Sequence, residues 1–147
     1  MVRVMRKEFI SFIIAVFTIT ACKKEIDILS FAQCHDSQHL DSITISNRLT
    51  GSWKWSKQSC FWSDKTVKAN KTVQVTFNSN TSFTISENSN VISQGTWKLK
   101  IVDSNSWGLD LSLASEYLYG RIFLCNNQVL FNNSYIDGCD NLFNRSQ

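Results

Sequence analysis

The residues of this chain best suited to covalent or metal chemistry are five cysteines and two histidines. Cys34, His35, Asp36 and His39 lie close together, and histidines four positions apart can share one face of a helix. This spacing permits a metal site. Cys34 is better suited to a disulfide, however, and both histidines lie in a polar segment, so we expect no metal centre.

Other patterns that support catalysis are weak. Because both histidines precede the first expected strand, a Ser-His-Asp or Cys-His arrangement requires that segment to fold back. No glycine-rich phosphate loop is present. Asp137 and Asp140 flank a Gly-Cys pair and are interpreted as polar neighbours of a turn rather than calcium ligands. We therefore expect a protein that is not an enzyme and holds no cofactor.

The cysteines at 34, 60, 125 and 139 form an even set once Cys22 is set aside. In an oxidising compartment four cysteines imply two disulfides, with three possible pairings. We favour Cys60 with Cys125 and Cys34 with Cys139, because both bonds close long loops and join the flanking segments to the domain.

The N-terminal segment has the pattern of a secretion signal. Arg3, Arg6 and Lys7 supply positive charge ahead of residues 9–19, which are apolar apart from two hydroxyl side chains. That run is shorter than the ~20 residues that span a bilayer. It therefore indicates a signal peptide rather than a transmembrane helix.

Residues 19–22 read Ile-Thr-Ala-Cys, which resembles the lipobox of bacterial lipoproteins. The resemblance implies that residues 1–21 are removed and that Cys22 carries acyl chains such as palmitate. In such lipoproteins an Asp after the cysteine is the usual signal for inner-membrane retention, and Lys23 stands there instead. This implies anchoring to the outer membrane, facing either the periplasm or the cell surface.

Residues 22–47 lack a sustained hydrophobic period and predict an irregular tether. Within it, Asp-Ser-Ile at 41–43 fits a short O-glycosylation pattern of Bacteroidetes-type bacteria, with Ser42 as the acceptor. Residues 48–147 form the expected domain.

Within the domain, apolar residues alternate with polar ones, as in half-buried antiparallel strands. The odd-numbered side chains of 73–77 and 97–101 are expected to face inward, and Gly95 is expected to bend a long strand. Asn-rich and Ser-rich turns separate the runs. The sequence predicts a small up-and-down antiparallel β-barrel of about eight strands. The expected strands are 53–57, 72–78, 82–86, 96–101, 109–113, 119–124, 128–131 and 141–145.

The opening Leu-Thr-Gly-Ser-Trp at 49–53 resembles the Gly-x-Trp opening of lipocalins. Together with Gly-Thr-Trp-Lys-Leu at 95–99 and the ending at 135–145, it is similar to the lipocalin-like lipoproteins of Bacteroidetes-type bacteria. The resemblance implies that Trp53 plugs one end of the barrel and that a basic residue packs over it. Arg145 is the first candidate for that role.

The other candidate for that role is Arg121, which is also a candidate ligand residue. Further candidates for a ligand pocket are Trp55, Phe77, Trp97 and Tyr119, although aromatic residues more often fill a small barrel. The first functional hypothesis is a barrel that binds a small apolar or amphipathic ligand. The alternative is a solid barrel that binds protein, as an inhibitor or an accessory subunit of an envelope complex.

Charge argues against nucleic acid as a partner. The chain has a formal net charge of +3, and its first 21 residues account for most of it. The domain is therefore close to neutral, and its sequence contains no basic stripe.

Overall fold

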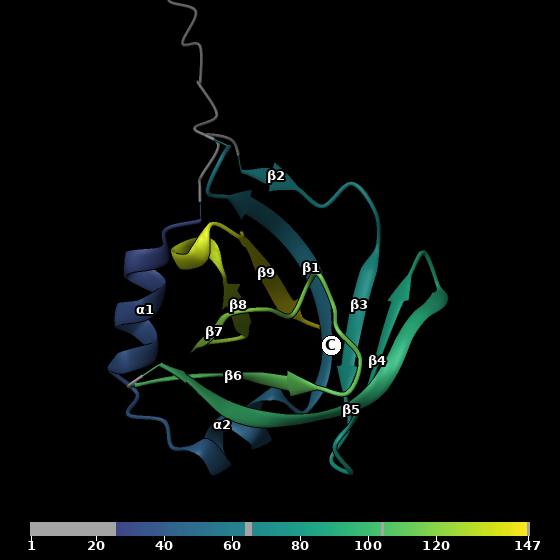
Figure 1. Cartoon of the computed structure of the whole chain (residues 1–147), viewed down its shortest axis with the longest axis horizontal. Coiled ribbons are helices and arrows are strands. Elements are labelled where there is room, and N and C mark those ends of the chain that lie inside the picture. Colours follow the sequence, from purple (N-terminus) through teal and green to yellow (C-terminus); the bar gives the residue numbers. More distant parts are fainter. Residues whose placement is uncertain (1–25, 64–65, 104, 147) are drawn as a thin grey trace, which may run out of the picture.

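The computed structural model describes residues 26–63, 66–103 and 105–146, so the expected signal peptide and Cys22 lie outside the described residues. The fold is a nearly closed antiparallel β-barrel with eight strands in the ring, which confirms the predicted class (Figure 1). The strands are β1 (Gly51–Cys60), β2 (Val67–Lys68), β3 (Val73–Phe77), β4 (Ser82–Glu87), β5 (Asn90–Asp103), β6 (Ser106–Leu111), β7 (Arg121–Cys125), β8 (Gln128–Asn132) and β9 (Cys139–Arg145).

The strand order is β6-β5-β4-β3-β1-β9-β8-β7, and β2 pairs with β1 outside the ring. Nearly every strand therefore pairs with its neighbour in sequence, and β1 with β9 is the long-range exception. The order ends at β6 and β7, which lie side by side without a backbone ladder in the described part of the chain. This junction is called the seam below.

The alternation predicted from sequence places the core correctly in most strands. Val73, Val75 and Phe77 are buried, whereas Gln74 between them is exposed. The exception is Ile101, expected inside but 66% exposed near the outer end of β5. There the pairing of β5 with β6 shifts register between Ile101 and Asp103.

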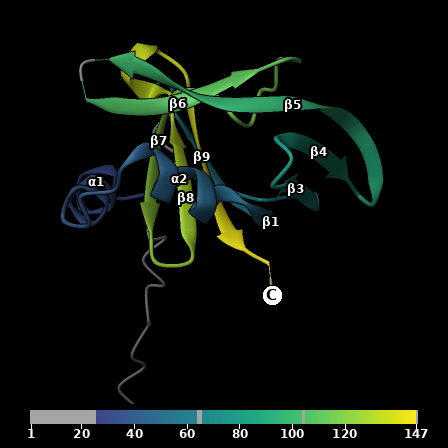
Figure 2. The same cartoon turned by 90° about the horizontal axis from the view of Figure 1, so that it is seen from below.

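Strand β5 changes its partner strand just after Gly95, the residue at which a bend was expected. Its first half pairs with β4 up to Thr96, and its second half pairs with β6 from Trp97 onward. A Cβ on Gly95 would lie 2.4 Å from the hydroxyl of Ser112 and 3.1 Å from the Phe83 ring, so glycine lets the residue that follows β6 approach this closely. Figure 2 shows the resulting long curve of β5, with β6 alongside its far half.

The segment expected to be an irregular tether instead contains two helices, α1 (Ile28–Asp36) and α2 (Ser42–Leu49). Each begins with an aspartate cap: Asp27 accepts from the Ser30 amide at 3.0 Å, and Asp41 from the Thr44 amide at 2.8 Å. The helices are too short for a hydrophobic period to stand out, which is why the tether prediction was wrong here. Ser42 is the first residue of α2, and its glycosylation stays a prediction.

Candidate functional site

The disulfides join Cys34 to Cys125 and Cys60 to Cys139, so the favoured pairing was wrong. Cys60 and Cys139 are register partners on β1 and β9. Cys125 ends β7, and Cys34 lies on α1, which packs against β7. The prediction failed because it treated the segment around Cys34 as a free tether.

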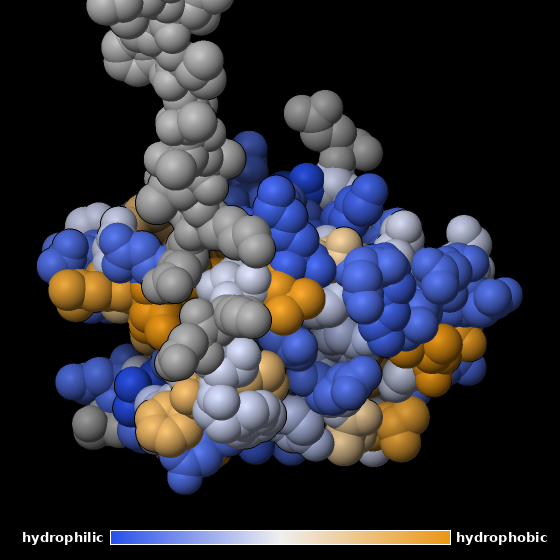
Figure 3. All heavy atoms as spheres, turned by 90° about the horizontal axis from the view of Figure 1, so that it is seen from above, coloured by the Kyte–Doolittle hydropathy of each residue, from blue (hydrophilic) through white to orange (hydrophobic). Residues whose placement is uncertain are grey.

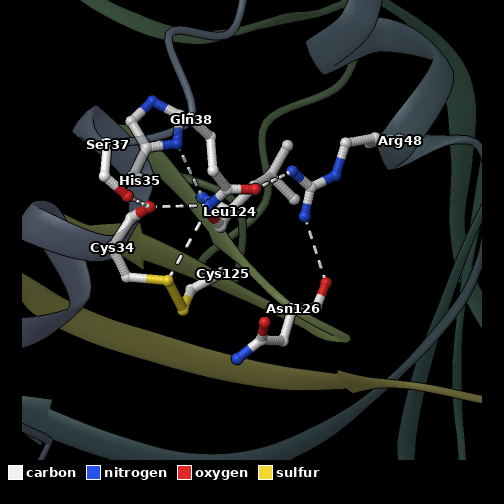
Figure 4. The surroundings of a disulfide bond; sticks show 8 residues. All are labelled: Cys34, His35, Ser37, Gln38, Arg48, Leu124, Cys125 and Asn126. Atoms are coloured by element: carbon white, nitrogen blue, oxygen red, sulfur yellow. Dashed lines mark hydrogen bonds between the residues drawn. A yellow bond between two sulfur atoms is a disulfide. The ribbon is translucent and has the colours of Figure 1, made fainter.

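The bond from Cys34 to Cys125 fixes α1 against the seam (Figure 4). There the Leu124 amide donates to Nδ1 of His35 at 3.0 Å, and the Leu124 carbonyl accepts from Nε2 of Gln38 at 3.0 Å. His35 in the last turn of α1 and Gln38 just after it thus take the place of a neighbouring strand at the open edge of β7. We call this arrangement the α1 latch.

Burial lowers the pKa of His35, which favours the neutral imidazole that accepts the Leu124 amide. The ring also packs edge-on against Phe123, with ring centroids 5.6 Å apart. Arg48 on α2 extends the network by donating to the Gln38 side chain and to the Asn126 carbonyl (Figure 4). These contacts give His35 a structural position.

Metal chemistry gains no support from the described residues, since no three His, Cys, Asp or Glu side chains among them are grouped to hold an ion. Asp140 is buried, and its carboxylate accepts from Asn132 Nδ2 at 2.9 Å and from the Asn133 amide at 2.7 Å. The amide and hydroxyl of Ser134 also donate to it, each at 2.8 Å. Protein donors therefore surround Asp140.

The closed end of the barrel has the arrangement that the lipocalin resemblance implied. The Arg145 guanidinium lies 4.8 Å from the Trp53 ring centroid, and Trp53 is fully buried. Arg145 also donates to the carbonyls of Arg48 and Thr50 at 2.8 and 2.7 Å, and Trp53 Nε1 donates to the Leu49 carbonyl at 2.7 Å. Strand β9 thereby holds the C-terminal end of α2 across the barrel floor.

The barrel interior is filled by its own side chains. Phe77 and Trp97 pack edge to face with ring centroids 5.2 Å apart, and Trp55 is equally buried. These three candidate ligand residues therefore belong to the core. The other fully buried large side chains of this core include Phe83, Ile85, Leu118, Ile122, Leu124, Phe131 and Phe143.

A loop covers the end of the barrel opposite the floor. Residues 112–120 cross between β6 and β7 as the green trace over the barrel in Figure 1. Tyr117 and Leu118 are buried, and Tyr117 packs edge to face on Trp55 at 5.6 Å. Asn141 Nδ2 donates to the Glu116 carbonyl at 3.3 Å and holds the loop down. Both ends of the barrel are thus covered.

The remaining two candidate ligand residues, Tyr119 and Arg121, lie outside the barrel. The Arg121 guanidinium stacks 3.9 Å from the Tyr135 ring centroid, and its Nε lies 2.6 Å from the Asp103 carboxylate. Tyr119 is 47% exposed. Arg121 therefore does not pack over Trp53 at the barrel floor. We call Tyr119, Arg121 and Tyr135 the Tyr-Arg surface.

A close backbone approach brings the parts of the Tyr-Arg surface together. Gly120 has a φ of +92°, and a Cβ there would lie 1.9 Å from the Asn132 carbonyl oxygen. Only glycine fits this position, which presses the chain beside Tyr119 against the end of β8 and the 3-10 turn η1 (Ser134–Ile136).

A second feature is a hollow of about 280 Å³ between α1 and the outer face of β1, β8 and β9. Its apolar lining includes Ile26, Phe31 and Leu142, and Lys57 contributes a cation. Sequence analysis missed this hollow because α1 was not expected. Its only signal was the adjacent apolar pair Leu142 and Phe143 in β9, because one of the two must face outward, away from the core.

No protein family, curated protein or solved structure matches this chain. The described residues contain no helix long and apolar enough to cross a membrane.

Proposed function

We propose that the mature chain is a non-enzymatic lipoprotein, anchored to the outer membrane through lipid on Cys22, whose barrel binds a protein partner through its outer surface. The lipobox-like residues 19–22 support the anchor. The Gly-x-Trp opening, with Arg145 over Trp53, supports kinship with the lipocalin-like lipoproteins of Bacteroidetes-type bacteria.

The filled barrel is the observation that carries the choice of a protein partner. Ligand sites in barrels are concave and hold much of the ligand in the mouth or interior. Here Trp53, Phe77 and Trp97 occupy the interior, α2 covers one end and Tyr117 covers the other. A barrel of this kind presents its loops and outer surface for recognition.

The Tyr-Arg surface is the proposed contact. Tyr and Arg are enriched among the residues that dominate protein interfaces, because each offers a large rigid contact area with a polar tip. The salt bridge to Asp103 and the stack on Tyr135 hold Arg121 in one orientation before binding. Such preorganisation lowers the entropy lost on association.

The anchor is tested by metabolic labelling with palmitate. Wild-type protein takes up the label, and Cys22→Ala does not. Label that persists in Cys22→Ala would reject the lipoprotein assignment.

The protein partner is tested by cross-linking in intact cells of the host. Wild-type chain gives a discrete cross-linked protein, and the double variant Tyr119→Ala/Tyr135→Ala loses it. The matched control Val91→Ala/Ile92→Ala removes exposed apolar side chains from the start of β5 and retains the product. An unchanged product in the tyrosine variant, or native mass spectra showing only a bound small molecule, would contradict the proposal.

The hollow under α1 favours a second candidate, a small amphipathic ligand. Its walls combine apolar side chains with the charged groups of Asp27 and Lys57, which suits such a molecule. Ser30→Phe places a ring in the hollow and should abolish binding of a fluorescent fatty acid, whereas Gln33→Phe, on the exposed face of α1, should not. Equal binding by both variants would exclude this site.

A further inference from the structure

Two large aromatic side chains stand in solvent directly after β1. Phe61 is 67% exposed and Trp62 is 70% exposed, whereas Trp53, Trp55 and Trp97 are buried. Exposure of adjacent large apolar residues costs solubility and marks a contact surface when it occurs in a group.

The group includes side chains from two neighbouring segments. Val67 on β2 is 49% exposed, and Ile136 in η1 is 61% exposed. The Phe61 amide donates to the Gly138 carbonyl at 3.1 Å, next to the disulfide that ends β1 and begins β9. We call Phe61, Trp62, Val67 and Ile136 the hairpin-tip patch.

The hairpin-tip patch lies on the side of the barrel where the described chain begins. Ile26 and Asp27 line the same hollow as Lys57, and Lys57 pairs with Lys68 on β2. The end of β1, β2 and the start of α1 all lie toward the top of Figure 1. Figure 3 looks onto this face and shows hydrophobic groups set in a mostly hydrophilic surface.

The chain between Cys22 and Ile26 is long enough to bring the lipid level with the end of β1. Ile26 lies four positions after Cys22, and at about 3.5 Å per position the chain between them extends at most about 14 Å. From Lys57, which lines the same hollow as Ile26, β1 continues for three residues to Cys60, about 10 Å at the rise of a strand, and the turn that holds Trp62 follows. A lipid on Cys22 and the aromatic tip can therefore meet one plane.

We propose that the hairpin-tip patch inserts into the headgroup region of the bilayer that holds the lipid on Cys22, which orients the barrel on the membrane. This inference rests on the lipid anchor of the proposed function. Tryptophan favours the membrane interface because its ring is amphipathic, and phenylalanine, valine and isoleucine add apolar area that buries in the acyl boundary.

Lysines near the patch suit an anionic membrane surface. Lys57 and Lys68 face each other across the base of the hairpin, and the sequence places Lys23 and Lys24 between the lipid and α1. Basic residues close to a membrane are attracted to anionic headgroups within a Debye length. A lipid surface is therefore favoured over a protein as the occupant.

The test uses the full-length lipidated protein reconstituted into vesicles of phosphatidylethanolamine and phosphatidylglycerol with and without brominated acyl chains. Bromine quenches tryptophan that enters the bilayer. With five tryptophans in the chain, Trp62 should make about a fifth of the emission quenchable, and Trp62→Phe should abolish that fraction. Phe61→Trp should roughly double the quenchable fraction.

The matched control is Ile43→Trp, which adds an exposed tryptophan on α2, at the bottom of Figure 1, whereas β2 and the end of β1 lie at the top. It should leave the quenchable fraction unchanged. No quenching of Phe61→Trp, or equal quenching of both added tryptophans, overturns the inference. Palmitate labelling of the same samples separates this outcome from failure of the anchor, since labelled but unquenched protein keeps the proposed function and loses the orientation.

Discussion

At the scale of single residues, Arg145 joins three parts of the molecule. Its guanidinium covers Trp53 in the floor and donates to carbonyls at the end of α2 and the start of β1, while its backbone belongs to β9. A lysine offers one charged point in place of this planar fork. The planar shape of the Arg145 guanidinium, and not its charge alone, therefore accounts for these contacts.

Arg145→Ala should lower the free energy of unfolding by about 1–2 kcal/mol, because the stack on Trp53 and two hydrogen bonds are lost. Urea unfolding would show a lower midpoint with an unchanged slope. Arg145→Lys should recover only part of the loss. Full recovery by lysine would show that charge alone suffices at this position.

His35 should make the stability depend on pH. The folded state lowers its pKa from 6.5 by burial, so the unfolded chain binds the proton more readily. The free energy of unfolding should therefore hold above pH 6.5 and fall as the pH drops through 6.5 toward the lowered value. Urea midpoints measured between about pH 7.5 and 5 would report the loss.

His35→Asn provides the matched variant, because an amide oxygen can accept from the Leu124 amide without titrating. It should flatten the pH dependence, whereas His39→Gln, at an exposed position, should keep it. An equally steep pH dependence in His35→Asn would remove this role from His35.

At the scale of elements, the α1 latch shows how a short helix completes a barrel. The ring lacks a ladder between β6 and β7, and the end of α1 hydrogen-bonds to both backbone groups of Leu124 in place of a strand. An open strand edge invites pairing with another chain, so covering it protects the monomer.

Cys34→Ser/Cys125→Ser should release α1 while the barrel stays folded. The unfolding free energy should fall by about 2–4 kcal/mol, because the lost bond spans 91 residues of chain. Hydrogen exchange should speed up in α1 and at Leu124, with β3 and β4 unchanged. Uniformly faster exchange would indicate that the latch stabilises the whole barrel instead.

Strand elements were predictable because alternation in 73–77 and similar runs reflects burial on one face only. The two helices were not, since their eight or nine residues bury few side chains and depend on the barrel for stability. The disulfide between Cys60 and Cys139 was partly predictable from the sequence. An antiparallel pair of Trp53 with Arg145, extended without a bulge, places Cys60 opposite Gly138, and the bulge between Trp55 and Lys57 moves its partner by one residue to Cys139.

At the scale of the whole molecule, a packed core fills the barrel where a ligand cavity could lie. About 100 residues enclose little volume, and large rings such as those of Trp53, Phe77 and Trp97 fill it. Sequence alone left this open, because aromatic residues line pockets and fill cores equally well. Only their mutual contacts in three dimensions distinguish the two.

Trp97→Ala should open a cavity and lower the free energy of unfolding by about 3–5 kcal/mol. The variant should also bind a small apolar dye that wild-type protein excludes, measured by fluorescence titration. Trp62→Ala, at an exposed position, should do neither. Binding of the dye by wild-type protein would show that the interior is accessible after all.

The pairing of β1 with β9 has a consequence for how the protein is made. During synthesis the opening strand must wait for the closing strand of the ring, since Trp53 finds its neighbour Arg145 only after 91 intervening residues have emerged. Until then β1 lacks this partner strand. A fragment that ends before Cys139 cannot close the barrel between β1 and β9. We therefore expect nascent fragments to remain protease-sensitive up to that point and to gain resistance abruptly once it is passed.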